Sequence, residues 1–335
     1  MPTPMQASVA PQATAKAVAA RPVAAAHLPN ARICVSATNA ARAAAAAAVT
    51  AAKSGRGAPV PAATAMAASG QGAPPPAAAP PTRPTLYDVP VSNNGARCRY
   101  VIYSQGLDVA IASPAALGGL RSPEFLALSP NGKMPVLRLP APAGDLPAAA
   151  AAAGLAAIYE SEVISQYLVS AAFCPPGTLR AADPLAQARA DLATRAHDMY
   201  VTTAQGCMYK GGLTAEERSA GLAQLSFQLD ALERVVAAGG GPFVCGAEVT
   251  TADAALAPTF EFMVRILPRH FGWADVFAGR PALRAWWGGL RARDAAMARI
   301  LDEVAGGLEA WEAAKRWDEL GITAQVARGE ARYAF

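Results

Sequence analysis

The sequence predicts a small α+β domain followed by an all-α domain, because the spacing of apolar residues changes twice along the chain. From residue 85 to residue 172, short strand-like runs alternate with short helical ones. After a Cys-Pro-Pro-Gly sequence at 174–177, almost every long segment has helical spacing. The predicted divisions are an N-terminal segment at 1–84, an α+β domain at 85–172, a linker at 173–182, a helical domain at 183–318 and a tail at 319–335.

The N-terminal segment is expected to be unfolded. Residues 1–84 contain seven Lys or Arg and no Asp or Glu, and Ala, Pro, Ser and Thr dominate them. So few large apolar groups cannot offset a backbone entropy of roughly 1 to 2 kcal/mol per residue. Acid-free, Arg- and Ala-rich N-termini are typical of organelle transit peptides, and the run at 33–37 resembles a plastid processing site. We expect a chloroplast protein, with a mitochondrial address or an untargeted Ala/Pro tail as alternatives.

The remaining residues are mildly acidic, with 22 basic against 25 acidic side chains, so the overall charge of +4 comes from the N-terminal segment. This balance argues against nucleic acid as a partner. No apolar run reaches the 18 or more residues that a membrane span needs, so a soluble protein is expected. The cysteines show no metal-binding or redox spacing, and we expect free thiols and no metal cofactor. They are Cys34, Cys98, Cys174, Cys207 and Cys245.

The α+β domain is predicted to contain strand, helix, strand, irregular helix, hairpin and helix, an order that suggests a thioredoxin-like domain. Ser122-Pro-Glu favours a helix start, because proline suits the first turn. The hairpin is interrupted by an Ala/Pro/Gly-rich loop at 140–156 that is long enough to be an insertion. The expected bounds are 85–89, 95–105 and 107–112, a helix from 122, hairpin strands at 136–139 and 157–159, and a last helix containing Val163 and Leu168.

The helical domain is predicted to have long helices at 184–208 and 215–238. A third helix is expected to open at Thr250, with Asp253 returning a capping bond to its amide. Pro268 is expected to end or kink that helix, and further helices follow Pro281. For the chain end from Glu309, the sequence leaves open whether it covers a pocket or trails as a tail.

Two motifs in the α+β domain suggest a site for a small peptide anion. The first, Gly132-Lys-Met-Pro, is typical of a turn into an edge strand whose backbone is held open to a ligand. The second, beginning at Tyr159-Glu-Ser, is typical of an acidic N-cap that opens an amphipathic helix.

Together with two further landmarks, these motifs resemble the cytosolic-type glutathione S-transferases. The landmarks are Ser-Asn-Asn-Gly-Ala-Arg-Cys-Arg-Tyr-Val-Ile from 92, Gly-Lys-Met-Pro-Val-Leu from 132, Glu-Ser at 160, and Gly246 with Thr-Thr-Ala-Asp from 250. They occur in the family's order over about 86–300, and the first is similar to the plant tau and phi pattern. The resemblance implies a homodimer.

By this resemblance, Ser92 is the catalytic serine. It would stabilise the glutathione thiolate together with the positive end of the first helix. Asn93 replaces the usual proline after this serine, so Asn93 or Asn94 could share or replace the role of Ser92. A simple helix cap remains the alternative for Ser92. Arg97 is expected to anchor the first helix or the domain interface, and Cys98 to be a buried structural thiol.

The same resemblance implies the glutathione contacts. Met134 would precede a cis proline, Pro135, and pair its backbone with the cysteinyl segment as an added strand would. Lys133 would meet the glycyl carboxylate, although a solvated surface lysine is also possible. Ser161 and the amides at its helix start would hold the γ-glutamyl carboxylate, and Glu160 the ammonium; an ordinary capped helix start is the alternative.

The function so implied is glutathione conjugation to small hydrophobic electrophiles, as in detoxification, with glutathione as cosubstrate. The acceptor is expected between the domains, along one helix face that carries Tyr200, Thr203, Cys207 and Met208. Two alternatives stay open. One is a glutathione-dependent peroxidase or isomerase, and the other is a non-catalytic carrier of hydrophobic plastid metabolites.

Overall fold

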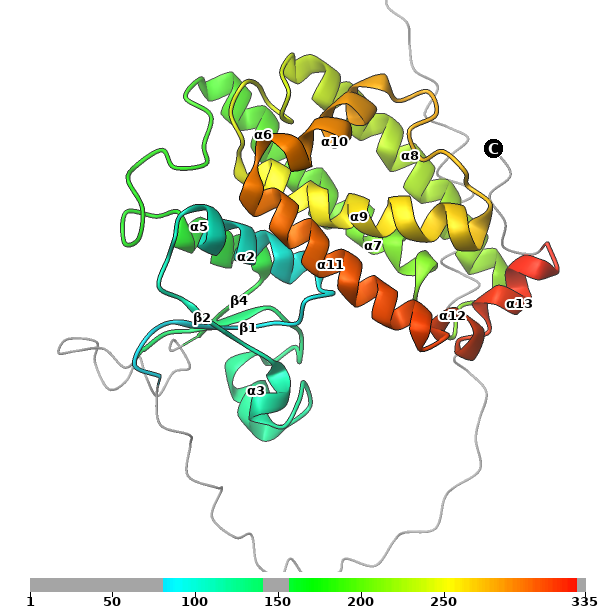
Figure 1. Ribbon diagram of the computed structural model, residues 1–335, viewed down its shortest axis with the longest axis horizontal. Helices are drawn as coiled ribbons and strands as arrows, with labels where there is room; N and C mark the ends of the chain where they lie inside the picture. The colour runs from blue at the N-terminus through cyan, green and yellow to red at the C-terminus, as the bar shows by residue number, and fades with distance from the viewer. Residues whose placement is uncertain (1–80, 141–156, 330–335) are drawn as a thin grey trace, which may run out of the picture. The chain divides into compact units, whose positions relative to one another are not determined.

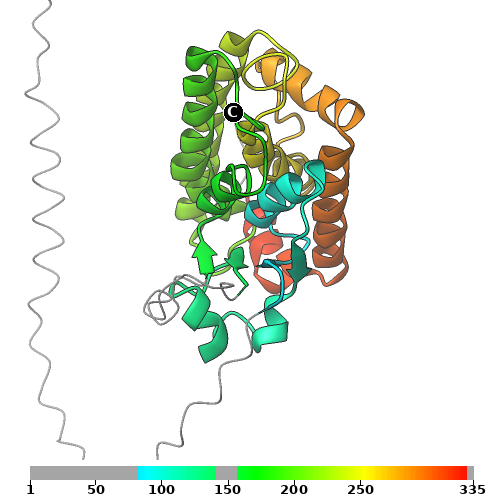
Figure 2. The same cartoon turned by 90° about the vertical axis from the view of Figure 1, so that its left-hand side faces the viewer.

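A computed structural model describes residues 81–140 and 157–329, so most of the expected N-terminal segment and the 140–156 loop lie outside the described residues. The α+β domain packs α2 and α5 on one face of a four-stranded sheet and α3 on the other (Figures 1 and 2). Its elements are β1 (Thr85–Tyr87), α2 (Asn93–Ser104), β2 (Ala110–Ala112), the 3-10 helix η1 (Pro114–Leu117), α3 (Pro123–Leu128), β3 (Val136–Arg138), β4 (Ala157–Tyr159) and α5 (Ser161–Leu168).

The sheet has the order β2-β1-β3-β4. β1 runs parallel to β2, whereas β3 is antiparallel to both β1 and β4. Leu86 of β1 lies opposite Ile111 and Leu137, so its side chain is fully buried at the centre. The first three strands are shorter than the sequence predicts, and β4 has the predicted bounds. Leu107 to Val109 forms a turn, because the Val109 amide donates to the Leu107 carbonyl at 2.8 Å.

The helical domain follows as the sequence predicts. Its elements are α6 (Pro184–Ala196), η2 (His197–Val201), α7 (Thr202–Gln205), η3 (Gly206–Met208), α8 (Ala215–Gly239), α9 (Thr251–Phe271), α10 (Pro281–Arg293), α11 (Ala295–Ala313), α12 (Arg316–Glu319) and α13 (Ile322–Ala327). The predicted helix at 184–208 is thus one helical path with a π-helical turn, η2, in its middle. Pro268 does not end α9, which continues for three residues to Phe271.

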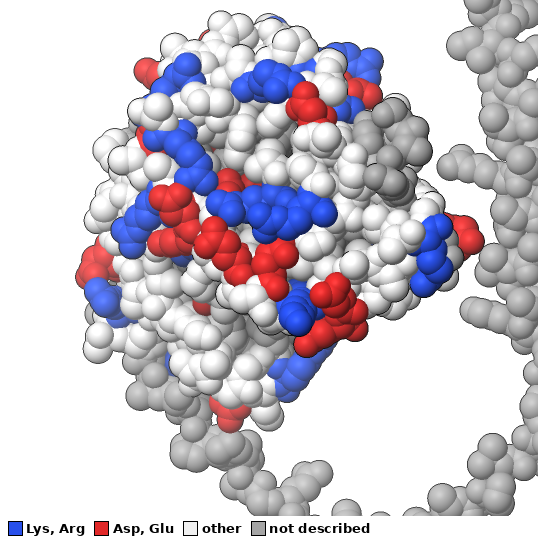
Figure 3. Space-filling view, turned by 45° about the vertical axis from the view of Figure 1, so that its right-hand side comes forward, with Lys and Arg blue, Asp and Glu red and all other residues white. Residues whose placement is uncertain are grey.

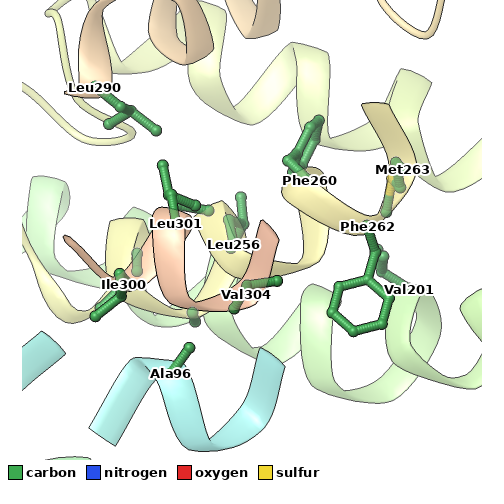
Figure 4. Packing of buried hydrophobic residues seen from close by; sticks show 14 of the residues in the cluster. Ala96, Val201, Leu256, Phe260, Phe262, Met263, Leu290, Ile300, Leu301 and Val304 are labelled. Carbon is green, nitrogen blue, oxygen red and sulfur yellow. The ribbon is translucent and has the colours of Figure 1, made fainter. Parts of the chain in front are cut away.

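The core joins the two domains through α2, which packs on α5, α9 and α11. Figure 4 shows Ala96 of α2 beneath Leu256 of α9 and beside Ile300 and Val304 of α11. All four side chains are fully buried. The small Ala96 side chain allows this close approach, so the start of α2 is held by both domains.

The chain end packs on the helical domain rather than trailing from residue 319. Trp317 of α12 is buried and donates its indole N–H to the Met208 carbonyl at 2.8 Å. Ile322 of α13 is also buried, although it belongs to the predicted tail. The helical domain therefore continues past residue 318, to at least the end of α13.

The surface mixes charges of both signs. Figure 3 shows Lys and Arg side chains beside Asp and Glu across the face that it presents. Ion pairs among the described residues include Arg265 with Glu309 at 3.1 Å and Arg284 with Asp275 at 2.5 Å. Within residues 81–140 and 157–329, no helix is long and apolar enough to cross a membrane.

Candidate functional site

A cleft of about 1030 Å³ lies between the two domains. The α+β domain contributes the first turn of α2, the turn before β3, and the start of α5. The helical domain contributes α6, η2, α7 and the two residues that follow η3. All five predicted glutathione contacts line it: Lys133, Met134, Pro135, Glu160 and Ser161.

The turn before β3 carries the predicted cis bond. The Met134–Pro135 peptide is cis, and the sheet pairing of β3 begins only at Val136. Met134 therefore lies beyond the ladder, beside the cleft. Ser129 fixes this turn, because its hydroxyl donates to the Lys133 carbonyl at 2.8 Å. The Lys133 side chain is exposed and has no ion-pair partner among the described residues.

The start of α5 faces the cleft without a cap from the protein. Glu160 occupies the N-cap position, as the acidic N-cap prediction requires, but its side chain makes no capping hydrogen bond. Its backbone has φ 70° and ψ 112°, a conformation that normally needs glycine. The free amides after Glu160 thus form a positive helix end, beside the Ser161 side chain, to which an anionic group could bind.

The start of α2 is organised differently, and the placement of Ser92 matches the cap alternative. Its hydroxyl accepts from the Gly95 amide at 3.0 Å, and Ser92 is not among the residues that line the cleft. Asn94, two residues after Ser92, does line the cleft. Of the two asparagines that the sequence left open, Asn94 is therefore the one with access to a ligand.

Asn93 requires a correction of the predicted role. It is buried, and its amide nitrogen donates to Thr259 at 2.8 Å and to Gln205 at 3.3 Å. Thr259 also bonds the His197 ring at 2.8 Å. These partners belong to the helical domain, so the Asn93 amide joins the two domains, and Asn93 is not among the residues that line the cleft.

Sequence reasoning missed a buried ion pair behind this helix start. Asp88 and Arg99 are both almost fully buried and contact each other. Arg99 also donates to the carbonyls of Val89 at 2.9 Å and Pro90 at 2.7 Å, which fixes the loop leading to Ser92. Burial raises the pKa of Asp88 to about 6, although Arg99 and Ser92 oppose that rise. An Asp eleven residues before an Arg carries no local signal that could have revealed the pair.

Arg97 anchors the domain interface, as predicted. Its buried guanidinium pairs with Glu162 of α5 at 3.1 Å and contacts Asp198 and the His197 ring of η2. Burial acts to raise the pKa of Asp198, but hydrogen bonds from His197 and Arg97 outweigh this effect and hold that pKa below its usual range. Burial lowers the pKa of His197, so that ring is neutral at neutral pH. Glu162 and Asp198 line the cleft with their charges already paired.

The predicted acceptor face is only partly right. Thr203 lines the cleft, but Cys207 and Met208 are buried in the core, and Tyr200 is exposed away from the lining residues. The π-helical turn at His197–Val201 explains the difference, because an additional residue in one turn rotates every later side chain around the helix axis. Met199 and Tyr209 take the places beside Thr203.

The cysteines within the described residues are free thiols. Cys98, Cys174, Cys207 and Cys245 are all buried, as expected for Cys98 in particular. Burial raises the pKa of the Cys98 and Cys207 thiols to about 12 and that of Cys245 to about 11. These thiols are therefore protonated at neutral pH. No group of His, Cys, Asp or Glu in the described part of the chain is arranged to hold a metal ion.

Comparison with known protein families gives the same two domains. The glutathione S-transferase N-terminal domain matches residues 86–176, and the glutathione S-transferase C-terminal domain matches residues 215–286. The chain belongs to the glutathione S-transferase superfamily. Its α+β domain is accordingly thioredoxin-like, and the helical domain follows it in the order typical of a glutathione S-transferase.

Individual relatives agree with this assignment. Glutathione S-transferase 3 of Zea mays is 29% identical over 224 residues, which cover 63% of this chain and 90% of the maize protein. Glutathione transferase F2 of Populus trichocarpa has the same fold at a TM-score of 0.51 and 18% identity, over 67% of this chain and 99% of the poplar protein. A family member from Pseudomonas fluorescens, solved with two glutathione molecules bound, aligns at a TM-score of 0.53 and 21% identity over 65% and 92% of the two chains.

Proposed function

We propose that this glutathione S-transferase superfamily member binds glutathione in the cleft and conjugates it to small electrophiles. One observation carries the proposal: the uncapped start of α5 lies in the same cleft as Met134, just before β3, and Asn94 of α2. The helix end suits a carboxylate, the Met134 backbone suits an extended peptide, and the α2 start suits a developing sulfur anion. Glutathione has all three groups in that order.

In the proposed complex, the γ-glutamyl carboxylate binds Ser161 and the free amides of α5, and its ammonium pairs with Glu160. The cysteinyl backbone pairs with Met134 as an added strand would. Lys133 then meets the glycyl carboxylate. Each charged group of the tripeptide thus has a polar or oppositely charged partner. Among the described residues, Glu160 and Lys133 have no ion-pair partner, so both are available to glutathione.

The thiolate is proposed to lie at the start of α2. Asn94 is the side chain of that turn that lines the cleft, and its amide can donate to the sulfur. Ser92 holds the turn by capping Gly95, and the helix end contributes positive potential. The thiol proton leaves to solvent, and the sulfur electron pair then attacks the electrophilic carbon. The bond to a leaving group breaks, or the displaced π electrons take up a proton.

A difference spectrum in the thiolate band of the ultraviolet, recorded while glutathione is added to the full chain at neutral pH, tests the proposal. The buried thiols of the described residues contribute no band, because burial raises their pKa. A band that saturates with glutathione is expected. Glutathione binding without a band would instead favour a non-catalytic carrier, and no binding would leave only a shared fold. A peroxidase or isomerase would show the same band and differ in the acceptor that it turns over.

A homodimer is also proposed, because apolar side chains remain exposed on two neighbouring faces. Tyr159 and Val163 are 41% and 53% exposed around the start of α5. Leu192 and Met199 are 55% and 45% exposed on α6 and η2. Association of these faces would remove apolar surface from water. Sedimentation equilibrium should give twice the chain mass.

The proposed chloroplast address can be checked by imaging a fluorescent fusion of residues 1–84 in plant or algal cells.

A further inference from the structure

The cleft contains a cation, Lys210, to which the proposed glutathione complex gives no role. Two of the cleft carboxylates, Glu162 and Asp198, are both ion-paired to Arg97. Lys133 is assigned to the glycyl carboxylate in the proposed function, on which this inference rests. Lys210, from the helical domain, also lines the cleft and has no ion-pair partner among the described residues.

The Lys210 side chain lies along its own helical path, over Gly206. A Cβ atom added at Gly206 would lie 2.8 Å from Cδ of Lys210 and 3.1 Å from its Nζ. The lysine stem therefore crosses the helix at the bare Gly206 backbone. Gly206 follows Gln205, which accepts a hydrogen bond from Asn93 at 3.3 Å. Gln205, Lys210 and Asn94 of α2 all line the same cleft, so an acceptor held by the ammonium group shares that cleft with the proposed sulfur position.

The segment that carries Lys210 is rigidly held. Arg218, which is buried, donates to the Lys210 carbonyl at 3.0 Å and also contacts the Cys207 carbonyl. Trp317 donates to the Met208 carbonyl at 2.8 Å. A charged group on such a fixed backbone is better suited to recognition than one on a loop, because less conformational freedom is lost on binding.

Several of the other residues that line the cleft are polar rather than apolar. Thr202, Thr203 and Gln205, from the helical path that leads to Lys210, also line the cleft. Tyr209 lines it as well, and its ring is fixed against Phe262 and Trp311. Burial raises the pKa of Tyr209 to about 12, so its hydroxyl keeps a proton to donate. Tyr209 and Lys210 both line the cleft, and a phenol and an ammonium can each donate to a carboxylate.

We propose that the preferred acceptor of this enzyme is an electrophile that carries a carboxylate, and that Lys210 selects it. This differs from the hydrophobic acceptor that the sequence alone suggested. For an unsaturated carbonyl compound with a distant carboxylate, the sulfur electron pair forms a bond to the β-carbon. The π electrons move to the α-carbon and carbonyl oxygen, and a proton from water completes the adduct. Lys210 binds the carboxylate and takes no part in this bond exchange.

Ethacrynic acid and its methyl ester form the matched test. Both carry the same unsaturated ketone, but only the acid is an anion at neutral pH. At saturating glutathione, kcat/KM for the acid is expected to exceed that for the ester by about five- to tenfold, the range for a charge-assisted hydrogen bond at a partly exposed site. Lys210→Gln should remove this preference by lowering only the value for the acid, and Lys210→Arg should keep it.

Lys315→Gln is the control. Like Lys210, Lys315 is exposed, but it is not among the residues that line the cleft. It should leave the preference unchanged. Equal or better turnover of the ester by the unaltered enzyme would overturn the inference, as would an equal loss for both acceptors in Lys210→Gln. If neither acceptor reacts above the uncatalysed rate and glutathione gives no thiolate band, the proposed function itself fails, and this inference fails with it.

Discussion

Two helix starts in this molecule show opposite uses of the same free amides. At α9, the protein itself closes the helix start: the fully buried Asp253 accepts from the Thr250 amide at 2.9 Å and from its hydroxyl at 3.1 Å. At α5, Glu160 makes no cap bond and adopts φ 70°. The first arrangement contributes folding energy, whereas the second leaves binding potential unused by the protein. The difference separates a structural helix start from one suited to a ligand.

Asp253→Ala should have the largest effect, and it should act on stability alone. Asp253 also accepts from the Val244 amide and the Trp286 indole, both at 2.9 Å, so its loss leaves several buried donors unpaired. We expect the free energy of unfolding to fall by about 3 kcal/mol, which exceeds the 0.5 to 2 kcal/mol of an ordinary cap. Chemical denaturation measures this, and the glutathione Kd should not change. A weakened Kd in the folded variant would show that α9 also serves the site.

Glu160→Gly should separate binding from backbone conformation at α5. Loss of the carboxylate should raise the glutathione Kd by about tenfold, because a charge-assisted bond to the ammonium is removed. Glycine tolerates φ 70°, so the unfolding free energy should rise by about 1 kcal/mol. Titration calorimetry and thermal unfolding measure the two effects.

Glu160→Gln is the matched variant, since it loses the charge but keeps the side chain. It should weaken binding without any gain in stability. If Glu160→Gly were less stable than the unaltered protein, we would conclude that the positive φ of Glu160 does not lower the free energy of unfolding.

Asn94→Ala tests which residue at the α2 start reaches the sulfur. Loss of one donor to the thiolate should lower kcat by about tenfold to a hundredfold, somewhat below the effect of an oxyanion-hole donor. The glutathione thiol pKa in the complex should rise, and the glutathione Kd should change little. Asn94→Ala with full turnover, together with an inactive Ser92→Ala of normal stability, would restore Ser92 to the role suggested by the resemblance.

The sequence predicts local features here better than long-range ones. The Met134–Pro135 turn, the Glu160–Ser161 helix start and the strand at 157–159 follow from motifs of a few residues, and the structure shows each of them at its predicted position. The buried Asp88–Arg99 pair and the Asn93–Thr259 bond depend on how elements pack, which no local pattern records. The π-helical turn at His197–Val201 is likewise not recorded by any local pattern, and it changes which later side chains of this helical path face the cleft.

Ser92→Ala should have the smallest effect of the set, because α2 is closed by a single side-chain bond whereas Asp253 closes α9 with several. Loss of the cap on Gly95 should lower the unfolding free energy by about 1 kcal/mol. Turnover should fall less than in Asn94→Ala, since the packing of Ala96 and the loop bonds of Arg99 still hold the α2 start. Ser92→Thr keeps the capping oxygen and should restore stability. Denaturation and steady-state kinetics on Ser92→Ala, Ser92→Thr and Asn94→Ala measure these differences in stability and turnover. If Ser92→Ala is inactive and Ser92→Thr is fully active, the hydroxyl acts on the thiol itself.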